Sequence, residues 1–406
     1  MKEILKSIYP YLFLFFVFVL PLDKYATAIP NIVLIALLTF FPFVVSKKDF
    51  LKLKSKKIYI FSILIIYISI NSLLFQDYLS DITIIQKVIS AFLLIVLYIP
   101  IENINKLKKT IIVSVFIGIL ISLWNLYFFY LSNEEFKFAT GSIINEVLII
   151  DRLYLGILCI ISIIASLGLM DKNFNATNKW YFTNIIINVI FVLLISSRVA
   201  IILLFLLYLI KIFYTKKRKT YFFFSIGIIG VTMISFYLNN NLRERFLFTN
   251  NTEKNVNYVE LVKKWEPRVV IWKCNYLITK SDFNLFKGIG FYRAQEKLTD
   301  CYSEVIKDPK KREYFIKKQF NPHNQFLDFY LSSGLIAVIL FLILYSLLFF
   351  QSKYSYYKMA LFISLLLFTF IESFFHRQLG GYIFALILIL IMFEEKSKNL
   401  EKLSKQ

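Results

Sequence analysis

The sequence predicts an all-α polytopic membrane protein, and two observations lead to this fold class. Hydrophobic residues make up 58% of the 406 positions and the mean hydropathy is +0.66, whereas soluble domains are usually about 45–50% apolar. Apolar runs near the length that crosses a bilayer, roughly 17–25 residues, recur along the chain and are separated by short charged segments. We therefore expect one integral membrane domain.

Twelve apolar runs are expected to form transmembrane helices. In the first half of the chain they are Ile8–Leu22, Ile29–Val45, Ile58–Phe75, Ile82–Ile99, Thr110–Leu131 and Leu153–Leu169. In the second half they are Tyr181–Ser196, Val199–Tyr214, Tyr221–Leu238, Phe326–Phe350, Tyr357–Phe375 and Tyr382–Phe393. The first and the last are short for a span. This count divides the chain into nine helices over 1–238, one large loop over 239–325, and three helices with a tail over 326–406.

The distribution of Lys and Arg predicts the orientation of these helices, because cytoplasmic loops of membrane proteins are enriched in positive charge. Successive loops alternate between Lys-rich segments, such as 46–57 and 215–220, and segments that carry mostly Asp or Glu. The alternation puts both termini on the cytoplasmic side and residues 239–325 on the opposite side. The net charge of +21 is therefore mainly a topology signal, which makes nucleic-acid binding the weaker interpretation.

The hydrophilic segment 239–325 is the only one large enough to form structure outside the bilayer. It contains seventeen Lys or Arg and ten Asp or Glu residues, so it could serve a polyanionic ligand or simply be a solvated loop. Arg293 within it could meet an acidic oligosaccharide, although a solvated position is favoured. Cys274 and Cys301 also lie here, and whether they form a disulfide stays open because an oxidising compartment would only permit one.

Two arginines stand where ionisable groups are expected to meet the outer membrane face. Arg198 follows two serines in a polar break between spans, where it could either snorkel to lipid phosphate or bind a ligand. Arg268 follows Glu266 and Pro267, a pattern that predicts a helix starting near Arg268 and lying along the membrane surface. A guanidinium offers a planar fork of donors that suits phosphate, so two of them could hold a pyrophosphate.

His323 is one of only two histidines and comes just before an apolar run. Asn321 can cap a helix and Pro322 suits its first turn, so we expect His323 at a helix N-terminus. The positive end of the helix dipole disfavours an imidazolium there, and a neutral imidazole can take a proton from a sugar hydroxyl as a general base. The alternative is a histidine that only caps the helix or lies at the interface.

Other polar groups near the same face are weaker candidates. Arg152 could contact phosphate or be the ion-pair partner of Asp151. Glu372 and His376 are four residues apart and Arg377 follows, so we expect an internal salt bridge on one helix face near the outer end of its span.

The motifs resemble those of the O-antigen ligase family. The string from His323 fits a His-[Asn/Ser/Gln]-x9-Gly pattern with Asn324 second and Gly334 last. The order of features also agrees: the Ser-Ser-Arg turn, a long outer loop with an arginine ahead of a Trp, and a Gly-Ile-Gly-Phe string at 288–291. The architectural resemblance covers nearly the whole chain, and motif agreement is confined to 196–200 and 268–334.

The resemblance implies a GT-C-like glycosyltransferase with about twelve transmembrane helices, a mainly helical periplasmic loop and no cofactor or metal. It implies a glycan on undecaprenyl pyrophosphate as donor and the lipid A-core oligosaccharide as acceptor, joined with inversion at the periplasmic face of the bacterial inner membrane. Carried over to this chain, Arg198 and Arg268 would neutralise the donor pyrophosphate and His323 would activate the acceptor hydroxyl. An O-antigen or capsule polymerase and a protein O-oligosaccharyltransferase use the same donor class, and both stay open.

Two further classes are disfavoured by the residues themselves. The sequence has no Asp-x-Asp string and no Cys/His cluster with ligand spacing, which argues against a metal site. A lipid-linked glycan transporter would call for ionisable groups near the bilayer midplane, whereas the candidate groups gather at the outer rim.

Overall fold

The computed structural model describes residues 2–132, 141–171, 175–215, 266–281 and 283–393, with residues 230 and 237, and every regular element in them is a helix. The first half contains α1 (Lys2–Val19), η1 (Leu20–Leu22), α2 (Ile29–Val44), η2 (Asp49–Leu53), α3 (Lys56–Phe75), α4 (Tyr78–Tyr98), α5 (Ile104–Ser132), α6 (Gly141–Val147) and α7 (Arg152–Leu167). The second half contains α8 (Ala176–Leu194), α9 (Arg198–Tyr214), α13 (Pro267–Lys280), α14 (Phe291–Val305), α15 (Pro309–Lys318), α16 (Gln325–Ser352), α17 (Tyr356–Ile371), η3 (Phe374–His376) and α18 (Gln378–Met392).

The helices agree with a polytopic membrane protein. Among the described residues, six segments are long and apolar enough to cross a bilayer: Lys2–Leu22, α3, α4, α5, α8 and α16. Four shorter helices, α2, α7, α17 and α18, are also apolar. Eleven of the twelve expected spans coincide with a helix, and the remaining one, Tyr221–Leu238, lies almost wholly outside the described residues.

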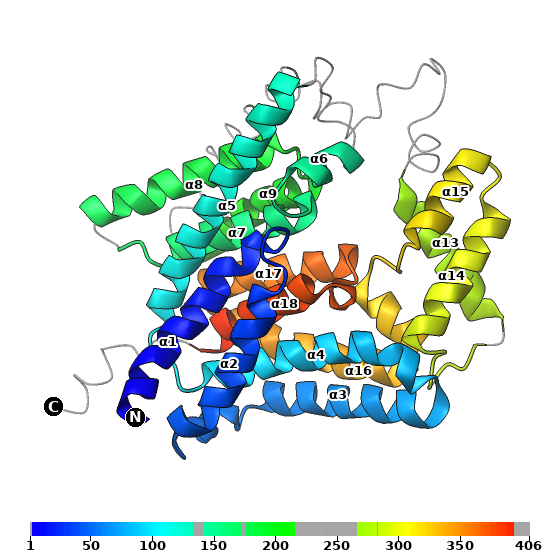
Figure 1. The fold of residues 1–406 in the computed structure, drawn as a ribbon, viewed down its shortest axis with the longest axis horizontal. Coiled ribbons are helices and arrows are strands. Elements are labelled where there is room, and N and C mark those ends of the chain that lie inside the picture. The colour runs from blue at the N-terminus through cyan, green and yellow to red at the C-terminus, as the bar shows by residue number, and fades with distance from the viewer. Residues whose placement is uncertain are drawn as a thin grey trace.

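Helices α7 and α18 form the interior of the bundle. Residues 379–391 of α18 are all buried, and α7 is buried around nearly its whole circumference. In Figure 1, α17 and α18 lie in the middle of the ribbon, between α3, α4 and α16 on one side and α5, α7 and α9 on the other. Helices α7 and α18 are apolar around nearly their whole circumference, which is the pattern of a helix enclosed by others.

A close approach of α7 to α9 positions the Ser-Ser-Arg turn. A Cβ placed on Gly156 would lie 2.6 Å from the Ser197 Oγ and 3.1 Å from the Ala200 Cβ, so a side chain at this position would crowd the turn. Ser196 has a φ of 50°, which ends α8 abruptly and lets α9 begin at Arg198. Small residues at such contacts are typical of helix packing in membranes.

The helices α13, α14 and α15 form a small second core, separate from the bundle (Figure 1). The core gathers Ile271, Ile278, Leu298 and Phe315, with Leu331 from α16. Cys274 and Cys301 are joined by a disulfide inside it. The described part of the hydrophilic segment is thus a folded helical unit anchored on α16.

Helix α16 is broken at Gly334, which has φ 76° and ψ −171°. The segment before α14 pairs with the broken turn: Ile289 N donates to Leu331 O at 2.8 Å, Gly290 N to Ser332 O at 2.9 Å, and Leu335 N to Leu285 O at 2.8 Å. A Cβ on Gly334 would overlap the Phe286 carbonyl. The glycine at the end of the His-Asn-x9-Gly string therefore permits backbone docking of the loop.

We predict that Gly334→Ala destabilises the protein by about 2 kcal/mol or more. The added methyl group would meet backbone at a positive φ, so neither the helix nor the loop could accommodate it without moving. Thermal unfolding of the purified protein in detergent measures the effect. Ser346→Ala, on the exposed face of the same helix, is the matched control, and equal melting temperatures for the two variants would contradict the prediction.

Candidate active site

One carboxylate joins the two predicted arginines. Arg198, the first residue of α9, donates from Nη1 to the Glu266 Oε2 at 2.9 Å, and Arg268 donates from Nη1 to the Glu266 Oε1 at 3.0 Å. Pro267 occupies the first turn of α13 and Glu266 is its N-cap residue, which confirms the helix start predicted near Arg268. Residues 68 positions apart in the chain thus form one group of three charges.

The backbone at the end of α17 completes the surroundings of Arg268. Its Nε and Nη2 both lie 3.4 Å from the Ile371 carbonyl oxygen. Helix α17 ends at Ile371, and Glu372 continues in an extended conformation. Arg268 therefore contacts the backbone of the residue that directly precedes Glu372.

His323 faces Glu372 across the gap between α16 and α17. Its Nδ1 lies 3.0 Å from the Glu372 Oε2, and its ring packs against Phe320 with centroids 5.6 Å apart. The Glu372 side chain is 6% exposed and that of His323 is 21% exposed. The carboxylate is thus buried behind the ring, and the imidazole is the part of the pair that reaches the surface.

The expected helix start at Asn321 and Pro322 is wrong by three residues. Helix α16 begins at Gln325, and Asn324 is the N-cap, its Oδ1 accepting from Phe326 N at 2.9 Å and Leu327 N at 3.1 Å. Asn321 instead accepts from His323 N at 3.0 Å, which closes a turn in which His323 has a φ of 48°. His323 therefore stands just before the helix, and Asn324 satisfies the free N–H groups.

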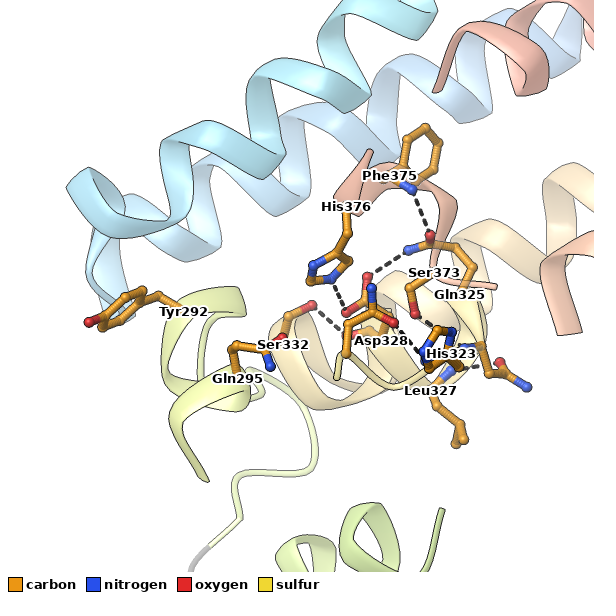
Figure 2. A network of polar contacts seen from close by, with 12 residues as sticks. Tyr292, Gln295, His323, Gln325, Leu327, Asp328, Ser332, Ser373, Phe375 and His376 are labelled. Atoms are coloured by element: carbon orange, nitrogen blue, oxygen red, sulfur yellow. Dashed lines mark hydrogen bonds and ion pairs between the residues drawn. The ribbon is translucent and has the colours of Figure 1, made fainter. Parts of the chain in front are cut away.

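A second histidine–carboxylate pair lies beside the first. The His376 Nε2 is 2.8 Å from the Asp328 Oδ1, and Gln325 Nε2 donates to the Asp328 Oδ2 at 2.8 Å (Figure 2). The pairs cross, because α16 and the turn before it supply His323 and Asp328 while the segment after α17 supplies Glu372 and His376. The expected internal salt bridge between Glu372 and His376 is therefore wrong: α17 ends before Glu372, so the two side chains do not share a helix face.

Hydrogen bonds to backbone hold these two segments together. Asn324 N donates to the Ser373 Oγ at 3.2 Å, Asn324 Nδ2 donates to the Phe370 carbonyl at 3.2 Å, and Phe375 N donates to the Gln325 Oε1 at 3.2 Å (Figure 2). The side chains of Asn324, Gln325 and Ser373 are polar and buried. Buried polar groups that are satisfied in this way fix one geometry, so the histidines and carboxylates are held rigidly.

Arg152 and Arg377 have other partners than expected. Asp151 forms its ion pair with Arg377, not with Arg152, whose Nη1 donates to the Ile195 carbonyl at 3.3 Å. Burial lowers the pKa of Arg377, while the nearby Asp23 carboxylate acts in the opposite direction. Arg152 thus braces the Ser-Ser-Arg turn, and Arg377 ties the start of α18 to α7.

The remaining candidate, Arg293, is exposed on α14 and lines a cavity with Phe75, Gln76 and Tyr292. Neither His323 nor the arginine pair lines that cavity. In the part of the chain that the structure describes, no group of three or more His, Cys, Asp or Glu side chains is arranged to hold a metal ion.

Several residues of the site were not identified from the sequence. Glu266, Gln325, Asp328 and Ser373 lie next to predicted residues in the chain, yet nothing in their spacing shows which groups they contact. The only sequence signal was their position beside Arg268, His323 and Glu372. Partners 48 or 49 residues away were not predictable from local pattern.

The fold is that of a multi-pass membrane protein, and a cluster of polar groups gathers at its helix ends. The family model described as O-antigen ligase matches residues 183–342. Residues 183–342 therefore match an O-antigen ligase family domain, as the motifs predicted, and this match supports an activity of the glycan ligase or polymerase type in general. The matched region contains Arg198, Arg268, His323 and Gly334. No curated protein matches the chain.

We predict that Asn324→Ala lowers the free energy of unfolding by about 1–2 kcal/mol, because the first N–H groups of α16 lose their acceptor. Asn324→Asp keeps that acceptor and should cost less. Chemical or thermal unfolding of the two variants in detergent checks the difference. Equal stability of Asn324→Ala and the parent protein would show that the cap contributes little.

Proposed function

We propose that this protein is an O-antigen ligase, which transfers a glycan from undecaprenyl pyrophosphate to the lipid A-core oligosaccharide at the periplasmic face of the inner membrane. The observation that carries the proposal is the convergence of Arg198, Arg268 and His323. They come from three separate segments, and Glu266, Ile371 and Glu372 connect them.

The arginine pair is suited to the donor pyrophosphate. Glu266 is a bidentate anion already bridging the two guanidinium groups, so their spacing fits an anion with two binding oxygens. A pyrophosphate would take the place of this carboxylate and gain charge-assisted hydrogen bonds from both forks. Neutralisation by guanidinium groups makes the pyrophosphate a better leaving group.

His323 is suited to act as general base. If its Nδ1–H donates to Glu372, its Nε2 carries the free lone pair, and the buried carboxylate stabilises the imidazolium that forms when a proton arrives. The acceptor hydroxyl oxygen would attack the anomeric carbon of the donor sugar as the bond from that carbon to the pyrophosphate oxygen breaks. The hydroxyl proton passes to His323, undecaprenyl pyrophosphate leaves, and the anomeric configuration inverts.

The distribution of Lys and Arg among the loops supports the proposed orientation of the protein in the membrane. The Lys-rich loops predict that both termini are cytoplasmic and that the site faces the periplasm, where a lipid-linked glycan and a lipid A-core acceptor would both be anchored in the membrane. The chemistry requires no cofactor and no nucleic-acid partner.

Deletion of the gene should leave lipid A-core without O chains, and the wild-type gene should restore them. His323→Ala should restore none, because loss of a general base removes about 10²–10⁴ in rate. Glu372→Gln should give a smaller loss, since the base remains but its orientation is weakened. Gel analysis of surface lipids measures O-chain attachment in the deletion strain and in the strains that carry each gene variant. Core that carries a single repeat unit in the deletion strain would instead identify a polymerase.

Replacing Arg198 or Arg268 by Lys should raise the KM for the lipid-linked donor by about ten- to hundredfold, because the charge survives while the fork of donors is lost. Transfer by purified protein in detergent measures it. Lys273→Arg, on α13 but outside the arginine group, is the control. Unchanged donor KM in both Arg variants would remove the pyrophosphate clamp.

A further inference from the structure

A cavity of about 430 Å³ is lined in part by the docked loop, residues 284–290, which pairs with α16 through backbone hydrogen bonds. The turn between α3 and α4 lines it from one side and residues 284–293 line it from the other. Its size falls within the roughly 300–1,000 Å³ of small-ligand sites. In Figure 2, Tyr292 of this cavity and His323 stand at opposite ends of the group, with Asp328 and His376 between them.

Hydrogen-bond acceptors with fixed positions converge in this cavity above Gly290. Gln76 Nε2 donates to the carbonyls of Lys287 and Ser332 at 2.7 Å each. These two hydrogen bonds fix the amide and direct its Oε1 away from both carbonyls. That Oε1 is buried and accepts no hydrogen bond from a described residue. A Cβ on Gly290 would lie 3.4 Å from it and 3.1 Å from the Asp81 Oδ2, so the glycine leaves this space open.

Asp81 is held in place but keeps accepting capacity. Its Oδ1 accepts from Tyr292 N at 2.8 Å and its Oδ2 accepts from the Ser72 Oγ at 3.0 Å. A carboxylate has about four lone-pair sites, so each oxygen can accept again. The cavity is also lined by Asp77, and among the described residues that line it Arg293 is the one cationic side chain. Carboxylates thus outnumber cationic side chains in the described lining, which favours a ligand that supplies hydroxyl protons over a phosphate.

Tyr292 supplies an apolar face next to these acceptors. It is 51% exposed, and a hydrogen bond from its hydroxyl to Glu296 raises the pKa of Tyr292 and steadies the ring. Phe75 also lines the cavity, but Lys287 Nζ covers its ring at 3.6 Å from the centroid. Aromatic faces bind the C–H side of a ligand while the acceptors bind its polar edge, and a pyranose has both.

The position of the cavity relates it to the reacting groups. Gly290 docks on Ser332, eight residues along α16 from Asn324, which corresponds to roughly 12 Å at 1.5 Å per residue. This is further than one sugar ring reaches and is within reach of an oligosaccharide. Phe291, which directly follows the docked loop, packs against the His376 ring with centroids 6.5 Å apart, so the cavity and the histidine–carboxylate pairs share a neighbour.

We propose that this cavity is a pyranose-binding subsite, in which Asp81 and the Gln76 amide oxygen accept from sugar hydroxyls and the Tyr292 ring packs on the sugar. It would hold a sugar that is not the reacting one, and it rests on the proposed glycan transfer. The sugar belongs either to the donor glycan or to the acceptor oligosaccharide, which share this chemistry.

Tyr292→Ala should raise the KM for one of the two glycan substrates about three- to tenfold, with kcat kept within about twofold. Tyr292→Trp retains an aromatic face and should restore the KM. The substrate whose KM rises identifies the source of the sugar. Tyr276→Ala, which removes an equally exposed tyrosine from α13 outside the cavity, is the matched control.

Binding of free glycans separates this proposal from the transfer reaction. Saturation-transfer NMR with the full-length protein would use two probes, the core oligosaccharide released by mild acid and the glycan released from the lipid-linked donor. Weaker binding of one probe by Tyr292→Ala supports the subsite even if the wild-type protein transfers nothing, an outcome that would sink only the proposed function. Unchanged KM values and unchanged binding of both probes would overturn the subsite, as would a fall in kcat alone or the same change in Tyr276→Ala.

Discussion

The break of α16 at Gly334 is the constraint on which the other features depend. A helix interrupted within its length leaves backbone groups that need partners, and the segment 285–290 supplies them through three backbone hydrogen bonds. Polar side chains of α3 reinforce the joint, since Tyr67 donates to the Phe286 carbonyl and Asn71 to that of Lys287, both at 2.8 Å. The small helical unit that carries Arg268 and Tyr292 is thereby fixed to the bundle.

The charged groups of the site are arranged so that each has an opposite partner. Two arginines share Glu266, and each histidine faces a carboxylate from the other segment. Partly buried charges are costly unless paired, and removing one partner from a buried pair typically costs about 3–5 kcal/mol. The pairing therefore positions the reactive groups and also joins the end of α17 to the start of α16.

Hydropathy predicted the helices well because every residue of a long apolar run contributes to it. The motif resemblance singled out Arg198, Arg268, His323 and Gly334, and all four lie within the region that the family model matches. Local sequence pattern failed to predict the cap and the side-chain partners that tertiary contacts determine. Asn321 and Asn324 are equally good caps by type, and only the path of the chain selects Asn324. Glu372 and His376 fit a helix by spacing, yet α17 stops at Ile371 and each turns to a partner on the other segment. The spacing of Cys274 and Cys301 likewise does not show that they pair, because the packing of α13 against α14 brings them together.

The shared carboxylate of Glu266 has a consequence for selectivity in a membrane crowded with phosphate. With two guanidinium groups and one carboxylate, the cluster carries a net charge of one. A phospholipid headgroup phosphodiester is singly charged and would gain nothing by exchanging with a carboxylate that is already tethered there. A pyrophosphate linked to lipid and sugar carries two negative charges and can outcompete it. On the proposed function, Glu266 acts as a charge threshold that keeps abundant monoanions out of the donor site and admits the rare dianion.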